Sequence, residues 1–197
     1  TDAVVVMIVQ GDERNYADQR WFEYVLWTDH SIPLVRKTLR EIRDECVLDA
    51  DSGRLRFTGG AEISVAYFRA GYTPDDYPTE AEWEARLLLE RSLAIKSPSV
   101  AYQLVGAKKV QQALARPGAV EKFLSAEASQ RLRASFAGLW GLGPDEDDAD
   151  IVKKVIAEPE GFVMKPQREG GGWNFYGDGA AKKLQEMSEE ERGAYIL

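Results

Sequence analysis

The sequence predicts an α/β protein whose N-terminal part is built on a parallel-type sheet. Residues 3–9 are apolar at every position and rich in β-branched side chains, which is typical of a strand covered on both faces. After Asp18, whose carboxylate favours the start of a helix, apolar residues such as Trp21 and Val25 follow at helical spacing. Residues 32–35 predict a second short strand, so strands and helices alternate at first.

A hairpin and a long helix follow these elements. Residues 38–46 predict a helix, and two β-rich runs at 54–58 and 62–68 flank the turn signal Gly59-Gly60. Thr79 and Glu82 then have the spacing of a capping box before a long amphipathic stretch. That stretch predicts a helix whose apolar side chains are those of Trp83, Leu87, Leu88 and Ile95.

The pattern changes near residue 104, where we place a boundary between two domains, residues 1–104 and 105–197. Beyond it the apolar spacing is mainly helical. The predicted elements are helices at residues 108–115, 120–124, 128–139, 151–157 and 178–187, and strands at 162–164 and from residue 195.

Composition narrows the classes of function. A net charge of −8 argues against nucleic acid as a partner, because a binder of phosphate backbones needs a basic face. The longest apolar run has seven residues, far below the ~20 that span a bilayer, so no membrane contact is expected. Cys46 is the only cysteine, and no signal-peptide pattern stands at the N-terminus. A cytoplasmic protein is therefore expected.

The glycine triplet Gly170–Gly172 predicts a phosphate-binding loop after the strand at 162–164. Three consecutive glycines let backbone N–H groups approach anionic oxygens without a Cβ in the way. Lys165 and Arg168 add cations that can reach ATP phosphates, and Glu169 adds an oxygen ligand for Mg²⁺. The alternative is a glycine-rich hairpin with solvated charges; neither a P-loop nor a Rossmann fingerprint is present.

Two polar loops follow predicted strands of the N-terminal domain. The first contains Glu13, Arg14, Asn15 and Gln19, and the second is Arg69-Ala70-Gly71-Tyr72. Ligands of open α/β sheets bind outside the carboxyl ends of strands, so both loops could face one pocket for a polar, carboxylate-bearing substrate. Ordinary turns with surface charges are the alternative interpretation.

Three other features are expected to be structural. His30 is the only histidine and lacks a G-x-S-x-G partner, so we expect a surface turn residue. Cys46 ends an amphipathic helix and is expected to pack rather than react. The acidic stretch at 145–150 lacks the spacing of a calcium loop and is expected to be a solvated helix start.

Taken together, five collinear segments resemble eukaryotic-type glutathione synthetase. They are Glu13-Arg14-Asn15 with Gln19; Arg69-Ala70-Gly71-Tyr72; Trp83-Glu84-Ala85-Arg86-Leu87-Leu88-Leu89-Glu90-Arg91-Ser92; Gly106 with Lys108-Lys109-Val110-Gln111-Gln112; and the segment from Lys165 to Gly172 with Asn174 and Tyr176.

The resemblance implies a substrate-binding domain over residues 1–104 and part of an ATP-grasp domain, truncated at its C-terminus, over residues 105–197. It also implies the ATP-dependent ligation of γ-glutamylcysteine and glycine to glutathione through an acyl phosphate. A cytoplasmic homodimer that requires Mg²⁺ is implied as well.

By the same resemblance, Glu13, Arg14, Asn15, Gln19, Arg69, Ala70, Gly71 and Tyr72 would bind γ-glutamylcysteine. ATP would be bound by Lys108, Lys165, Pro166, Gln167, Arg168, Glu169, Gly170, Gly171, Gly172, Trp173, Asn174, Phe175 and Tyr176, with Glu169 as a Mg²⁺ ligand. No catalytic residue is assigned to this span.

Two departures from the family pattern stand out. Trp173 occupies a position where the family usually has asparagine, and the family's other Mg²⁺ ligands and catalytic lid are missing from these residues. The chain alone is therefore expected to be inactive. The alternatives are a homologue that uses another amine, such as β-alanine, a catalytically silent synthetase-like binding protein, and a structural scaffold.

Overall fold

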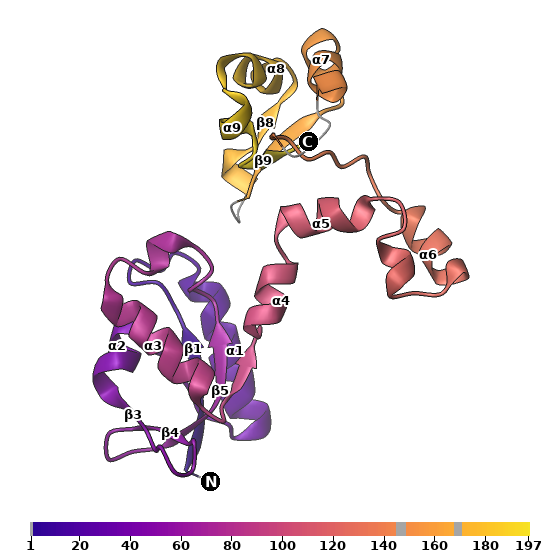
Figure 1. Cartoon of the computed structure of the whole chain (residues 1–197). Helices are drawn as coiled ribbons and strands as arrows, with labels where there is room; N and C mark the ends of the chain where they lie inside the picture. The colour runs from indigo at the N-terminus through magenta and orange to yellow at the C-terminus, as the bar shows by residue number, and fades with distance from the viewer. Residues whose placement is uncertain (1, 145–148, 168–170) are drawn as a thin grey trace. The chain divides into compact units, whose positions relative to one another are not determined.

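The computed structural model describes residues 2–144, 149–167 and 171–197, and the chain divides into two compact units, Thr1–Gln103 and Leu104–Leu197. The first unit holds a six-stranded mixed sheet, and the second holds a small antiparallel one (Figure 1). Among the described residues, no helix has the length and apolar character needed to cross a membrane.

The first unit alternates strands and helices before it forms a hairpin. Its elements are β1 (Ala3–Ile8), α1 (Tyr16–His30), β2 (Leu34–Lys37), α2 (Leu39–Glu45), β3 (Cys46–Leu48), β4 (Leu55–Phe57), β5 (Glu62–Phe68), the 3₁₀ turn η1 (Pro74–Asp76), α3 (Glu80–Arg91) and β6 (Ile95–Ser97), followed by α4 (Val100–Val105).

The sheet has the strand order β2-β1-β5-β4-β3, and β6 pairs with β5. The pairs β1/β2, β1/β5 and β5/β6 are parallel, whereas β3/β4 and β4/β5 are antiparallel. The predicted parallel strands therefore form one part of the sheet, and the predicted hairpin forms the other. β3 and β6 were not predicted, because Cys46 and Ile95, their first residues, were assigned to the preceding helices.

Alternating residues of β1 supply cores on both faces of the sheet. Val4, Val6 and Ile8 pack with α2 and α3, while Met7 and Val9 belong to a second cluster that Leu26 of α1 joins. Because successive side chains of a strand point to opposite faces, α1 covers one face and the pair α2 and α3 covers the other (Figure 1). The all-apolar sequence of β1 is explained by this double burial.

Some predictions from the sequence differ from the structure. Residues 32–35 were expected as a strand, but β2 lies two residues later, because Ser31 adopts a left-handed conformation that ends α1. His30 is the last residue of α1 rather than a turn residue. The helix predicted at 128–139 ends at Arg133 as α6, because the backbone of Trp140 pairs with that of Leu197.

The predicted apolar side of α3 was also wrong. Trp83 and Leu87 are about half exposed (51% and 47%), and Ile95 lies in β6. The helix instead buries Glu82, Ala85, Arg86 and Leu89. Ala85 and Leu89 pack in the core with β1 and β5, while Trp83 stacks on Tyr77 outside it.

The second unit contains α5 (Lys108–Ala115), η2 (Val120–Lys122), α6 (Ala126–Arg133), α7 (Ala149–Ala157), β7 (Val163–Pro166), η3 (Gly171–Trp173), β8 (Phe175–Tyr176), α8 (Gly177–Glu186), α9 (Glu189–Arg192) and β9 (Tyr195–Ile196). Its sheet has the order β8-β7-β9 with antiparallel pairs. Val155 of α7, Met164 of β7 and Leu184 of α8 are fully buried in its core.

Candidate functional site at the carboxyl ends of the parallel strands

The polar loops of the first unit start at one level of the sheet. Ile8, the last residue of β1, is paired with Lys37 at the end of β2 and with Phe68 at the end of β5. The segments that follow these three strands therefore leave the sheet at the same edge, which is where open α/β sheets bind ligands. The structure brings together the two loops that the sequence singled out.

On the α1 face of this edge, Gln19 organises the first loop. Its side chain is almost fully buried, with 1% exposed, and its Nε2 donates to Glu13 Oε2 at 2.6 Å. Arg36 of β2 donates to Gln19 Oε1 through Nε at 3.0 Å and Nη2 at 2.8 Å. The guanidinium of Arg36 also lies 4.7 Å from the ring centre of Tyr16. Gln19 thus uses both ends of its amide to join a carboxylate to a guanidinium.

Glu13 is kept in its charged form by this arrangement. Partial burial acts to raise the pKa of Glu13, but hydrogen bonds from the Asn15 amide, the Gln19 side chain and the Gln10 backbone, together with the charge of Arg36, outweigh burial and lower it. A carboxylate is therefore fixed next to exposed Arg14 and Asn15. Such a group can accept hydrogen bonds from an ammonium or amide of a ligand.

Arg69 lies on the same face of the sheet as Tyr67, which alternation along β5 dictates. Its Nη2 donates to Asp18 Oδ2 of α1 at 2.7 Å, and its side chain is 26% exposed. Burial acts to lower the pKa of Arg69, but the hydrogen bonds with Tyr67 and Asp18 outweigh that effect and raise it. This guanidinium remains charged and can bind a carboxylate bidentately.

The remainder of the second loop has a different environment. Ala70 is buried, with 2% exposed, and belongs to the core on the α2 and α3 face. Gly71 has a positive φ of 88°, which favours glycine. Tyr72 is 44% exposed at the surface. The four residues that the sequence grouped thus lie on both faces of the sheet edge.

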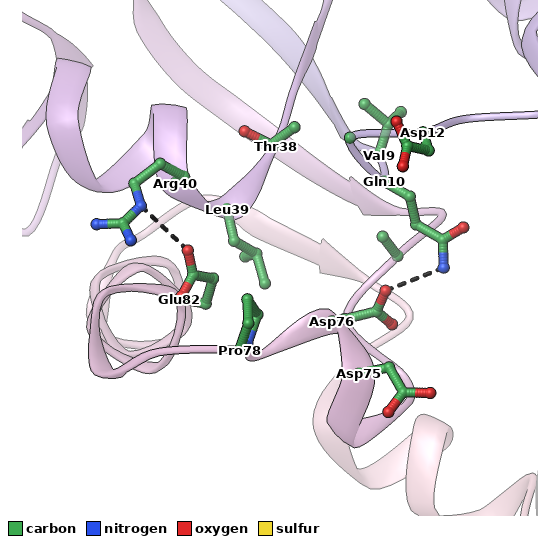
Figure 2. A pocket seen from close by; sticks show the side chains of 12 residues that line it. Val9, Gln10, Asp12, Thr38, Leu39, Arg40, Asp75, Asp76, Pro78 and Glu82 are labelled. Atoms are coloured by element: carbon green, nitrogen blue, oxygen red, sulfur yellow. Dashed lines mark hydrogen bonds and ion pairs between the residues drawn. The ribbon is translucent and has the colours of Figure 1, made fainter.

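A cavity of about 470 Å³ opens on the α2 and α3 face of this edge (Figure 2). Ala70 is the only predicted site residue that lines this cavity. The remaining lining residues are Val9, Gln10, Gly11, Asp12, Thr38, Leu39, Arg40, Asp75, Asp76, Pro78 and Glu82. Two contacts cross it, Gln10 Nε2 to Asp76 Oδ1 at 3.0 Å and Arg40 Nε to Glu82 Oε1 at 3.1 Å.

Several residues of this edge were missed by reasoning from the sequence. Arg36 and Asp18 contact predicted residues but belong to a strand and a helix that showed no functional signal. Glu82 was recognised only as part of a capping box. Its pairing with Arg40 depends on how α2 packs against α3, which local spacing does not encode.

The second unit places part of the predicted ATP-binding set together. Lys165 lies in β7 opposite Ile196 of β9, and buried Pro166 follows it. Gln167 Oε1 accepts a hydrogen bond from the backbone amide of Lys109, at the start of α5, at 2.9 Å. The residue after Lys108 therefore lies against the segment that follows Lys165. Arg168, Glu169 and Gly170 lie outside the described residues.

The end of the glycine-rich segment forms a single turn. Gly171 to Trp173 make up η3, and Trp173 is 61% exposed. Asn174 Nδ2 donates to the hydroxyl of Tyr176 at 3.3 Å. The buried Oδ1 of Asn174 has no hydrogen-bond partner among the residues that the structure describes. Phe175 packs near Tyr195, with ring centres 6.2 Å apart.

Comparison with known proteins identifies the family of this chain. The family model of eukaryotic glutathione synthase matches residues 3–105, which include both polar loops and every strand of the first sheet. The chain belongs to this family. This match confirms the family that the resemblance predicted.

Curated relatives of the family extend the match over the whole chain. Glutathione synthetase of Dictyostelium discoideum is 52% identical over 99% of this chain and 42% of its own length. The enzyme of Homo sapiens is 47% identical over 100% of this chain and 41% of its own length. The chloroplastic enzyme of Arabidopsis thaliana is 50% identical, over 99% of this chain and 36% of its own length. The chain thus spans about two fifths of the length of these relatives.

One solved structure agrees with the fold. A glutathione synthetase-like effector from Globodera pallida, in its apo form, has a TM-score of 0.68 and 19% identity over 99% of this chain and 40% of its own length. At this identity the likeness supports the arrangement of strands and helices alone.

Proposed function

We propose that the protein containing this chain is a glutathione synthetase, which joins γ-glutamylcysteine to glycine with the conversion of ATP to ADP and phosphate. The observation that carries this proposal is the agreement of about half of all residues with glutathione synthetases along the whole chain, 52% in one relative. The fixed carboxylate and guanidinium groups at the sheet edge support it, because γ-glutamylcysteine carries an ammonium and two carboxylates.

The first unit would bind γ-glutamylcysteine. In this proposal Glu13, held charged by Gln19, accepts hydrogen bonds from the ammonium of the substrate, with Arg14 and Asn15 beside it. Arg69 and the adjoining segment Ala70-Gly71-Tyr72 receive a carboxylate. Charge-assisted hydrogen bonds of this kind are about twice as strong as neutral ones.

The second unit would bind ATP as part of an ATP-grasp domain. Lys108 and Lys165 would neutralise phosphate oxygens, and the segment from Pro166 to Tyr176 would enclose the nucleotide. For Mg²⁺ the expected ligand is Glu169, which lies outside the described residues. Within the part of the chain that the structure describes, no three Asp, Glu, His or Cys residues are grouped as a metal site.

In the proposed reaction the γ-phosphoryl group of ATP passes to the cysteinyl carboxylate and gives an acyl phosphate. The amine of glycine then attacks the acyl carbon, the new amide bond forms, and phosphate leaves. The contribution of this chain is to position the substrate carboxylate in one unit and the phosphates in the other, and to neutralise their charge. These two effects supply most of the catalysis in phosphoryl transfer.

The amine that supports ADP release distinguishes a glutathione synthetase from the alternative functions. We expect the purified whole protein to release ADP from ATP only when γ-glutamylcysteine and glycine are both present, and mass spectrometry to identify glutathione. Release that depends on β-alanine would identify the homologue with another acceptor. Binding of γ-glutamylcysteine without ADP release would identify a silent relative.

Substitution of Lys165 tests the proposed nucleotide site. Lys165→Met in the whole protein is expected to lower turnover by about 10²-fold or more, as loss of one well-placed donor to developing charge does. Lys182→Met removes an amine from α8 that is 77% exposed, and it should leave turnover unchanged. Equal activity of the two variants would contradict the assignment of Lys165.

Homodimer formation and a cytosolic location stay predictions. Sedimentation of the whole protein and localisation of a tagged form would check them.

A further inference from the structure

The backbone of the segment that follows β5 is fixed by one carboxylate. Asp76 Oδ2 accepts hydrogen bonds from the backbone amides of Gly71 at 3.0 Å, Tyr72 at 3.2 Å and Thr73 at 3.2 Å. The hydroxyl of Thr73 donates to the same oxygen at 3.2 Å. A single oxygen thus sets the direction of three consecutive peptide groups.

The carbonyl of Gly71 is held from the opposite side. Its oxygen accepts hydrogen bonds from the Tyr77 hydroxyl at 2.8 Å, from Gln103 Nε2 at 2.9 Å and from Arg86 Nη1 at 3.4 Å. Arg86 is itself buried, with 8% exposed, and its guanidinium lies 4.2 Å from the ring centre of Phe68. Both polar groups of residue 71 are therefore fully engaged.

Glycine is required at this point for two reasons. The φ of 88° at Gly71 disfavours any L side chain, and an added Cβ would lie 2.9 Å from the Tyr77 hydroxyl. The hydrogen bonds to Gly71 therefore depend on the absence of a side chain there. The segment is thus held in one backbone conformation before any ligand binds.

The second carboxylate oxygen of Asp76 reaches the other polar loop. Gln10 Nε2 donates to Asp76 Oδ1 at 3.0 Å (Figure 2). Gln10 begins the loop that carries Glu13, whose pKa is lowered in part by a hydrogen bond from the Gln10 backbone. Asp76 consequently connects the segment after β1 to the segment after β5, 66 residues apart in the chain.

We propose that Asp76 is a positioning residue that fixes the substrate segment Arg69–Tyr72 relative to the loop containing Glu13. This inference rests on the proposed binding of γ-glutamylcysteine by these two loops. Binding sites work best when neighbouring groups lock the contacting residues in advance, because ordering a loop on binding costs affinity. Asp76 does not touch the substrate in this proposal; it acts through the backbone of residues 71–73.

Steady-state kinetics of the whole protein test the proposal. Asp76→Ala is expected to raise the KM for γ-glutamylcysteine about tenfold or more, since misplacement of a binding group by about 1 Å can cost up to ~10²-fold. The KM for ATP should stay within about twofold, because the nucleotide is bound elsewhere. Asp76→Asn keeps one acceptor oxygen and should recover most of the affinity.

Asp49→Ala is the matched control. Asp49 also accepts backbone amides, from Asp51 at 2.9 Å and Ser52 at 3.1 Å, but it lies in the turn between β3 and β4. Its loss should disturb that turn and leave both KM values unchanged. A rise in the KM for γ-glutamylcysteine in Asp49→Ala equal to that in Asp76→Ala would assign the effect to general destabilisation and overturn the positioning role.

Hydrogen exchange gives a second measurement that needs no substrate. In Asp76→Ala the amides of residues 71–73 should exchange about tenfold faster or more, whereas in Asp49→Ala only those of residues 51–52 should do so. Tyr77→Phe, which keeps the ring and removes one donor to Gly71, should give a smaller rise in the same KM.

The outcomes separate this inference from the proposed function. An unchanged KM for γ-glutamylcysteine in Asp76→Ala, beside an active wild type, would overturn the inference alone. Unchanged exchange at residues 71–73 would also overturn it, because Asp76 would then not fix the loop. A wild type without any dependence on γ-glutamylcysteine would overturn both.

Discussion

The burial and the hydrogen-bond partners of Gln19 are not evident from the sequence. A glutamine next to a polar loop is expected to be solvated, yet Gln19 near the start of α1 is 1% exposed and joins Glu13 to Arg36. Burial of an amide is tolerated because both its oxygen and its nitrogen find charged partners. The sequence identified Gln19 and Glu13 as candidates but gave no sign of Arg36, which lies in the next strand.

Cys46 is the residue for which reactivity can be predicted. Burial, helped by the charge of Glu45, raises the pKa of its thiol to about 11, and only 7% of the residue is exposed. At pH 8 about one thiol in a thousand would be ionised, and the thiolate is the nucleophile. We therefore expect negligible labelling of the folded chain by Ellman's reagent at pH 8 and one equivalent after unfolding in urea. Rapid stoichiometric labelling without urea would contradict the buried environment.

At the scale of elements, the start of α3 was predictable and its buried face was not. The capping box of Thr79 and Glu82 is present at the start of α3, because capping depends on residues three apart in the chain. The buried side of α3 depends instead on its neighbours. Arg86 is buried since it binds Glu90, Gln103 and the carbonyl of Gly71. Glu90 lies one turn away on α3, but Gln103 and Gly71 become close to Arg86 only after folding.

The cap of α3 gives a prediction for stability. Thr79 Oγ1 accepts from the amide of Ala81 at 3.3 Å and from Arg40 Nη2 at 3.1 Å. Thr79→Ala should lower the free energy of unfolding by about 1–2 kcal/mol, as loss of an N-cap does. Urea denaturation of the chain would measure the change.

Thr28→Ala, at an exposed position of α1, is the control for this measurement. A surface change of this kind should stay within about 0.5 kcal/mol. Equal effects of the two substitutions would show that the cap contributes nothing specific.

At the scale of the whole molecule, the chain matches about two fifths of each relative. In the proposed function the first unit binds γ-glutamylcysteine, and the second unit binds part of the nucleotide. More than half of each relative lies outside the matched part.

This coverage leads to a prediction about the chain by itself. We expect the 197 residues to form no measurable glutathione from ATP, γ-glutamylcysteine and glycine, because phosphoryl transfer needs its charge-neutralising groups assembled in one site. Chromatographic detection of the product, with the whole protein as the positive control, would check this. Product formation by the chain alone would show that the described loops suffice.

The sequence by itself determined the class of fold, the order of most elements and the family, because these depend on local apolar periodicity and on motifs of neighbouring residues. It also identified both polar loops, since each follows a recognisable strand. Only the tertiary structure decided that Ile8 aligns with Lys37 and Phe68, so that the loops meet. The fixing of Gly71 by Asp76, Tyr77 and Gln103 was likewise decided there, because hydrogen bonds between distant residues depend on strand register and helix packing rather than on spacing along the chain.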